Sequence, residues 1–172
     1  MTVVAIVGNP GNTLYEIIFY VHVLVAIVGY GTVVLNGLFA ANAQALDLPQ
    51  RFGAQSTKHR VDTIAEYFIY ANFAAGLLLV FLADENSVVG FDQTWVSLSM
   101  LLWIVAIGIS HGLLIPSEKK YLADLEAQVG GAEPGSTGVD LAALDKRMAA
   151  SGAGLNVLLA VILYLMIWKP GA

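Results

Sequence analysis

Three ionisable side chains within long apolar runs are the residues of this sequence that could do chemistry in a membrane. They are His22, Glu66 and His111. A titratable group in a bilayer is costly, so it usually faces other protein segments and marks a proton, ion or ligand site. Imidazole can ligate haem or a metal ion, and a carboxylate beside an imidazole can trade one proton with it near neutral pH. Ligand binding and proton transfer are therefore the chemistries that these residues indicate.

Four apolar runs must position these groups, and each is long enough to cross a bilayer. They cover residues 14–38, 64–83, 95–115 and 148–168. A membrane-spanning helix needs roughly 20 apolar residues. The chain is 58% hydrophobic and only 12% charged, whereas soluble domains are about 25% charged. The sequence therefore predicts an all-α fold, a polytopic membrane protein in which residues 1–172 form a single domain with a four-transmembrane-helix bundle.

The connections between these runs differ in composition. Residues 40–61 form a polar first connection, into which the first helix can extend as far as residue 46. Residues 84–93 form a short acidic second connection. The third begins at Pro116, which we expect to close the third helix. It contains a helical face that predicts a short surface helix on the membrane or on the bundle, followed by a flexible linker over residues 130–138. The residues of that face are Tyr121, Leu122, Leu125 and Val129.

Basic residues set the expected orientation. Seven of the eight Lys and Arg residues lie in the first and third connections. The positive-inside rule then places both connections in the cytoplasm and both termini outside (N-out/C-out), in the cytoplasmic membrane. The net charge of −5 and the small loops exclude nucleic-acid binding. The absence of cysteine excludes disulfides, thiolate metal sites and iron–sulfur clusters, and no metal site is expected.

A mid-membrane polar layer is predicted around His22. Counting from the outer ends, His22 lies about 12 Å deep, Asn72 about 16 Å and Asn156 about 18 Å. One interpretation is structural: His22 forms a hydrogen bond with Asn72 or Asn156 and fixes the helix register. A second is that His22 ligates haem b or a metal. A proton relay is the third.

Haem ligation would need a second axial ligand at nearly the same depth. His111 lies about 24 Å deep, roughly 12 Å from the level of His22. Met100 lies at about 7–8 Å, which is closer to His22. Met100 is therefore the better candidate for the second ligand, although methionine is also an ordinary packing residue.

A second polar layer is predicted near the inner membrane surface. Glu66 and His111 both lie about 24–26 Å deep, on helices that adjoin through the short second connection. They are expected to form an ion pair at the membrane edge. The alternative is a titrating pair that binds an ion or moves a proton.

Other polar side chains in or near the runs are assigned structural roles. His59, flanked by two basic residues, is expected to contact lipid headgroups. Thr13 and Glu16 fit a capping box at the start of the first helix. Tyr70 and the other membrane tyrosines are expected to be interfacial or packing residues.

The first helix carries a family resemblance. Residues 20–29, YVHVLVAIVG, resemble the opening helix of a family of predicted bacterial integral membrane proteins of unknown function. The same helix is similar to that of copper-resistance D-type membrane proteins and of the membrane-bound protoporphyrinogen oxidase of bacteria. The oxidase resemblance implies that His22 is a haem ligand. That family also uses a lysine inside the membrane, and this chain has none within its four expected spans.

Three functional hypotheses follow from the sequence. The first is a non-enzymatic bundle that acts as a small subunit or stabilising partner of a membrane complex, or as a homo-oligomer, with the lipid bilayer as its other partner. The short loops favour it. The second is a b-type haem protein with His22 as ligand, active in electron transfer or porphyrin chemistry. The third is a proton- or ion-coupled carrier that uses Glu66 and His111.

Overall fold

The computed structural model describes residues 8–9, 11–85 and 87–171, and this part of the chain is helical, without strands. The elements are α1 (Thr13–Gln44), α2 (Leu48–Phe81), α3 (Thr94–Ile109), the π turn η1 (Ser110–Leu114), α4 (Ile115–Val129) and α5 (Leu141–Trp168). Four stretches are long and apolar enough to cross a membrane: α1, α2, α3 together with α4, and α5. The predicted all-α fold with four membrane-spanning helices is confirmed.

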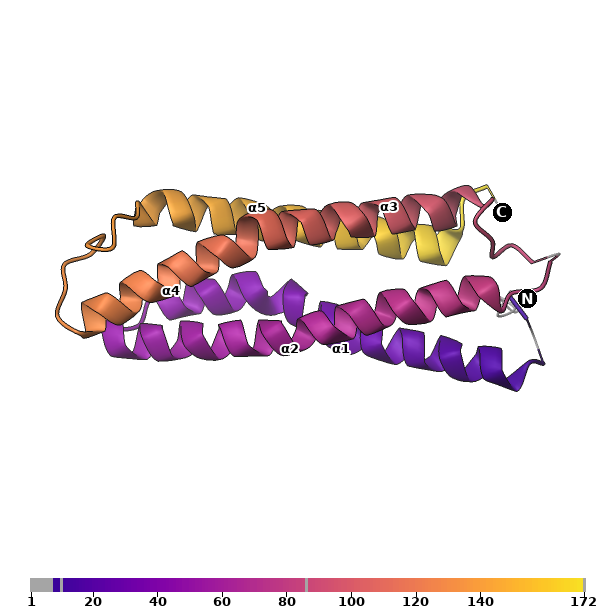
Figure 1. The fold of residues 1–172 in the computed structure, drawn as a ribbon, viewed down its shortest axis with the longest axis horizontal. Helices are drawn as coiled ribbons and strands as arrows, with labels where there is room; N and C mark the ends of the chain where they lie inside the picture. The colour runs from indigo at the N-terminus through magenta and orange to yellow at the C-terminus, as the bar shows by residue number, and fades with distance from the viewer. Residues whose placement is uncertain (1–7, 10, 86, 172) are drawn as a thin grey trace.

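The helices form two antiparallel pairs. α1 packs along α2, and α3 packs along α5. α4 continues from α3 through η1 and crosses to the start of α2 (Figure 1). We call the end with residues 45–47 and 130–140 the connection end, and the opposite end, where α1 begins and α5 ends, the terminal end (Figure 1). The polar starts of α2 and α5 meet α4 at the connection end, beyond the apolar runs.

A glycine allows the close approach of α1 and α2. Gly29 is buried, and a Cβ at this position would lie 3.0 Å from Ile69 Cγ1 and 3.2 Å from the Ile69 backbone nitrogen. A side chain here would therefore push against the backbone of α2, as at other small-residue contacts between membrane helices. The sequence of α1 thus fixes the spacing of the first pair.

The first connection is much shorter than residues 40–61. α1 extends to Gln44, and α2 begins at Leu48 after the Asp47 side chain accepts a hydrogen bond from the Gln50 backbone amide. Pro49 lies in the first helical turn, where its missing N–H costs nothing. The polar residues therefore continue the helix instead of interrupting it. With 34 residues, α2 is about 51 Å long and exceeds the roughly 30 Å of hydrocarbon.

Pro116 does not end the third helix as expected. The chain continues as α4 to Val129, with Pro116 in its first turn. The preceding π turn has already shifted the backbone ladder, since the Ile115 amide donates to the Ser110 carbonyl five residues back. Proline lacks an amide hydrogen, so it is tolerated where the regular ladder is interrupted.

α4 lies on the bundle at the connection end. Tyr121 and Leu125 are buried and pack with Leu144 of α5, whereas Leu122 is half-buried and Val129 is exposed. Apolar residues around this cluster come from the starts of α2 and α5. Of the two positions that the helical face allowed, membrane surface or bundle, the structure shows the second.

The expected flexible linker is folded against α4. Asp124, fully buried, accepts hydrogen bonds from the Thr137 hydroxyl at 2.6 Å, the Gln128 amide at 2.8 Å and the Gly135 backbone amide at 3.1 Å. These donors, with the Thr137 hydroxyl foremost, outweigh desolvation and lower the pKa of Asp124 from 3.8 to about 2. The glycine-rich composition of residues 130–138 therefore builds turns around a buried anion.

The cap of α1 also differs from the expectation. Asn12, not Thr13, is the N-cap, and its side-chain oxygen accepts from the Leu14 and Tyr15 amides at 3.0 and 3.3 Å. Glu16 is exposed in the first turn. Asparagine is as strong a cap as threonine or stronger, so the helix begins one residue earlier than a Thr13 cap would require.

Candidate functional site

Glu66, Tyr70 and His111 form one hydrogen-bonded group. Glu66 Oε1 lies 2.8 Å from His111 Nε2, and the Tyr70 hydroxyl donates to the same Glu66 oxygen at 2.7 Å. The Tyr70 oxygen also lies 3.0 Å from His111 Nε2. Glu66 and Tyr70 are one turn apart on α2, and His111 reaches them from η1. The structure thus brings together the predicted pair and adds a tyrosine.

The geometry requires a proton between Glu66 and His111. His111 Nδ1 lies 3.2 Å from the Ile107 backbone oxygen, and a carbonyl only accepts, so Nδ1 carries a hydrogen. At the other side of the ring, neither an ionised carboxylate nor an unprotonated Nε2 could donate across the 2.8 Å contact. One proton must therefore lie on Nε2 or on Glu66. The Glu66 and His111 side chains therefore share one hydrogen-bond proton.

The π turn positions the imidazole. In η1 the backbone ladder changes from four-residue to five-residue spacing, and the Ser110 amide bonds to both the Ala106 and Ile107 carbonyls. π turns within α-helices occur frequently at functional sites. Here the irregular ladder coincides with the side-chain hydrogen bond from His111 to Ile107. The turn and this bond together hold Nε2 toward α2.

A cavity of about 250 Å³ lies beside this group and is lined by residues of every helix. Its walls are mainly apolar and include Val33, Ile69, Ala106, Leu114, Leu159 and Ile162. Toward the connection end its lining includes Asn36, His59, Asp62, Glu66, Glu118 and Lys119. Apolar walls with a few convergent polar groups are typical of small-molecule sites. Glu66 belongs both to this lining and to the proton-sharing group.

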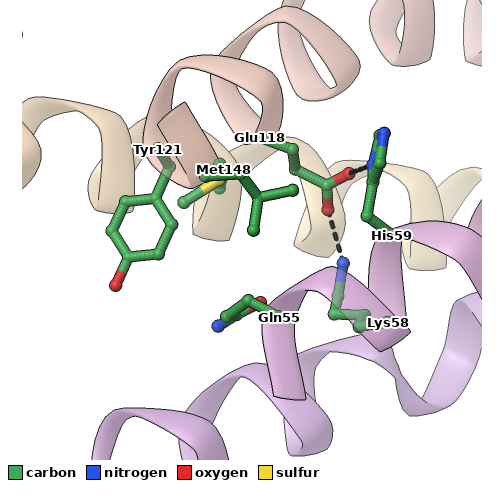
Figure 2. Close-up of a pocket in the computed structure, with 7 residues that line it drawn as sticks. Gln55, Lys58, His59, Glu118, Tyr121 and Met148 are labelled. Atoms are coloured by element: carbon green, nitrogen blue, oxygen red, sulfur yellow. Dashed lines mark hydrogen bonds and ion pairs between the residues drawn. The ribbon is translucent and has the colours of Figure 1, made fainter. Parts of the chain in front are cut away.

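The charged end of the cavity is organised by Lys58. Its ammonium group forms ion pairs with Glu118 of α4 and, at 2.8 Å, with Asp62 one turn along α2. Figure 2 shows the Glu118 carboxylate between Lys58 and His59, and His59 Nδ1 lies 3.3 Å from Glu118 Oε2. The Lys58 and Glu118 side chains are only 12% and 11% exposed. Burial alone would lower the pKa of Lys58, but attraction to Glu118 and Asp62 outweighs it and raises the pKa.

The expected role of His59 is therefore wrong. Its imidazole contacts Glu118 inside the bundle and does not project to lipid headgroups. The basic residues on either side of His59 had suggested a position at the membrane surface. Because α2 continues through this segment as helix, Lys58 and His59 can both reach α4.

Two buried polar atoms in the cavity lining have no hydrogen-bond partner, the acceptor Asp62 Oδ1 and the donor Trp103 Nε1. Asp62 Oδ2 is paired with Lys58, but Asp62 Oδ1 is buried and receives no hydrogen bond. An unpaired buried acceptor costs free energy, and such exceptions call for an explanation. A hydrogen-bond donor on a bound solute would satisfy Asp62 Oδ1, and an acceptor would satisfy Trp103 Nε1.

The mid-membrane polar residues do not form a single network. His22 Nδ1 lies 3.0 Å from the Asn72 backbone oxygen, so Nδ1 is the donor. Gly76 makes room for this ring, since a Cβ there would lie 3.2 Å from His22 Cε1. Asn72 has a long contact of 3.5 Å from its amide nitrogen to the Tyr30 hydroxyl. Asn156 is separate, and its buried side-chain oxygen has no partner.

Met100 and His22 lie on helices that are not neighbours. Met100 packs against the cluster formed by Val89, Trp95, Val96 and Leu165 at the terminal end. Among the described residues, the backbones of α1 and α3 do not come close to each other. In the same part of the chain, no group of three or more His, Asp or Glu residues could hold a metal ion.

Several residues of the site were not predicted as site residues from the sequence. The spacing of Tyr70 four residues after Glu66, and of Asp62 four residues after Lys58, places each pair on one helical face. That spacing could have identified both pairs. Glu118 had no such signal, because its partners are 59 and 60 residues away.

These features define a class and a family. Membrane-length helices that line a partly open cavity with charged side chains make this a polytopic helical membrane protein. The chain belongs to the family described as "Predicted integral membrane protein (DUF2269)", which matches residues 16–170. No curated protein and no solved structure matches the chain. The family description names no activity, so the role is argued from the site.

Proposed function

We propose that this protein is a proton-coupled carrier of a small solute. The observation that carries this proposal is the double position of Glu66, which lines the cavity and shares a proton with His111. Glu and His residues within membrane spans commonly form the proton relays of pumps and transporters. Here the Glu66 side chain is 27% exposed and the His111 side chain is 46% exposed. Binding in the cavity and proton movement would then depend on the same carboxylate.

The coupling follows from competition for Glu66. A solute that binds this carboxylate competes with His111 for it, and the proton held between them leaves to water. The Tyr70 hydroxyl lies within hydrogen-bond distance of both partners. The Tyr70 hydroxyl can therefore turn away from Glu66 and donate its hydrogen bond to the unprotonated Nε2 of His111.

The cavity favours a carrier over the non-enzymatic subunit that the short loops suggested. A bundle that only stabilises a complex gains most from close packing between its helices. A cavity of about 250 Å³ with charged residues at one end is instead what a binding role requires. We also propose that the connection end faces the cytoplasm, since it carries most of the basic residues.

The test is solute-driven proton movement in liposomes. The full chain is reconstituted with a pH-sensitive dye inside, and solutes of different charge are added outside. A transported solute should change the internal pH, and Glu66→Gln should abolish this change. Glu16→Gln, at an exposed carboxylate in the first turn of α1, is the matched control and should leave it intact. Equal responses in both variants and the parent chain would reject the proposal.

A second candidate, a b-type haem protein, is favoured by one observation at His22. Its Nδ1 donates to a backbone carbonyl, as in haem and metal sites where this bond orients Nε2 toward the metal. None of the hydrogen bonds of the described residues uses His22 Nε2. Haem held there would supply electron transfer, with His22 as the ligand.

An absorption spectrum tests this candidate. Protein expressed with haem available should show a Soret band that His22→Ala removes and His59→Ala retains. The absence of the band in the parent chain would reject haem binding.

A further inference from the structure

We infer that the central cavity binds a small organic monocation, an amine with an apolar body, and exchanges it for one proton. The site is that of the proposed carrier, so the inference rests on the proposed function for its location. It adds the chemical class of the solute and the stoichiometry of the exchange. Charge balance, an unsatisfied acceptor and the shape of the walls carry it.

Charge balance around the cavity leaves one place for a positive charge. Asp62 and Glu118 are offset by Lys58, which binds both, and by Lys119 in the lining. The third carboxylate, Glu66, is neutralised only by the proton that it shares with His111. Counting His59 as neutral, loss of that proton leaves the cavity with one net negative charge. A monocation restores neutrality, which sets the exchange at one cation for one proton.

The unpaired oxygen of Asp62 provides the acceptor for such a cation. Asp62 Oδ1 is buried without a hydrogen bond, and Asp62 and Glu66 are one helical turn apart on α2, both in the cavity lining. Side chains at this spacing share one face of a helix. An ammonium group has three donors and can serve two carboxylates at once. Neither an anion nor a neutral apolar molecule would satisfy this oxygen.

The remaining walls favour an organic cation over a metal ion. They are built largely from aliphatic side chains of α1, α3 and α5, which offer contact to a hydrocarbon body and no ligands to a metal. No set of metal-binding side chains was found in the described residues. The volume of about 250 Å³ is below the range of roughly 300–1,000 Å³ for drug-sized ligands. The solute is therefore small.

Calorimetry on the full chain in lipid nanodiscs tests the inference directly. The probes are 2-phenylethylamine, 2-phenylethanol and phenylacetate, which share an aromatic body and differ in charge. The amine should bind, and the alcohol and the acid should bind at least tenfold more weakly. Titrations in buffers of different ionisation enthalpy should show one proton released per amine. Equal affinity for the three probes, or amine binding without proton release, would overturn the inference.

Variants locate the binding in the cavity. Asp62→Asn should weaken the amine about tenfold or more, whereas Asp92→Asn, at an exposed aspartate between α2 and α3, should not. Ala106→Phe fills the cavity from its apolar wall and should abolish binding even if Asp62→Asn fails to fold. Unchanged amine affinity in Ala106→Phe would place the binding elsewhere and reject this site.

The two proposals fail in different ways. Amine binding with proton release but without proton movement in liposomes would reject the carrier and retain the binding site. Proton movement driven by an anionic or neutral solute, with no amine binding, would retain the carrier and reject the monocation.

Discussion

The Tyr70 hydroxyl lies 3.0 Å from Nε2 of His111, although 41 residues separate the two in the sequence. The same hydroxyl donates to Glu66, so one oxygen contacts both members of the proton-sharing pair. This bridging hydroxyl explains how the pair could separate without leaving an unpaired imidazole. It also makes the tyrosine a direct test of the coupling.

We expect Tyr70→Phe to slow solute-driven proton movement up to about tenfold without changing the fold. The substitution removes the donor that would satisfy the neutral His111 imidazole after Glu66 binds a solute, and a hydrogen bond between neutral groups is worth about 0.5–1.5 kcal/mol. The initial rate of internal pH change in liposomes measures the effect. Tyr67→Phe is the matched control, since Tyr67 is 71% exposed. Identical rates in the two variants would argue against a role for the hydroxyl.

We expect Lys58→Met to destabilise the connection end strongly. It leaves Glu118 and Asp62 without their cation, and loss of one partner of a buried ion pair costs about 3 kcal/mol or more. In a chain of this size that corresponds to a fall in the thermal unfolding midpoint of roughly 6–12 °C. Lys120→Met, at an exposed position of α4, should change the midpoint little. A comparable shift in both variants would contradict the importance of the pair.

The raised pKa of Lys58 predicts a loss of stability at high pH. A folded-state pKa above the unfolded value of 10.5 means that the folded chain holds this proton more tightly. The stabilisation is therefore complete below about pH 10.5 and is lost as the pH rises above it. Unfolding midpoints of the parent chain and Lys58→Met should converge in that range. A constant difference between them up to pH 12 would contradict the assignment.

We expect Thr137→Val to release the segment that folds against α4. The hydroxyl is the foremost contact of the buried Asp124 carboxylate, and valine has the same shape without the donor. Deuterium uptake by residues 130–138 should rise. Ser136→Ala removes a neighbouring hydroxyl that does not contact Asp124 and should leave the uptake unchanged. Equal uptake in both variants would show that the Asp124 contacts do not hold the segment.

The same carboxylate predicts an acid transition. The pKa of Asp124 is about 2, below its unfolded value of 3.8. Its contribution to stability is therefore present above about pH 4 and disappears as the pH falls toward 2. The thermal unfolding midpoint of the parent chain should exceed that of Asp124→Asn at pH 4, and the two midpoints should converge near pH 2. A constant difference between the two midpoints would contradict the transition.

We expect Gly29→Ala to weaken the α1–α2 pair, because the new Cβ would press on the backbone of Ile69. Gly31→Ala meets nothing within 4 Å and gains up to about 1 kcal/mol of helix propensity. The unfolding midpoint in detergent should fall for the first variant and stay level or rise for the second. The reverse order would show that the helices are not spaced by Gly29.

The sequence predicted the helices well because hydropathy records the length of an apolar run directly. It failed where polar residues continue a helix. Nothing in residues 48–63 breaks a helix, yet their polarity suggested a connection. Pro116 led to the expectation that the third helix ends there, because proline usually ends a helix. The π turn before Pro116 allows the helix to continue.

Only part of the candidate site could be predicted from the sequence. Depth counting placed Glu66 and His111 on one level, and the structure puts them in contact. The cavity could not be predicted, since its lining combines residues from every helix and depends on how the two pairs are spaced. Glu118 and Asp62 lie in segments that hydropathy treats as loops, so their inward orientation required the fold.

The five-residue backbone spacing at η1 accommodates one residue more than a regular helix would. Each residue of an α-helix turns the chain by about 100°, so this single insertion rotates everything that follows. Without it, the α4 surface that carries Glu118 would be swung by about a quarter of a revolution away from Lys58. The extra residue in η1 thereby determines which face of the amphipathic helix α4 is turned toward α2.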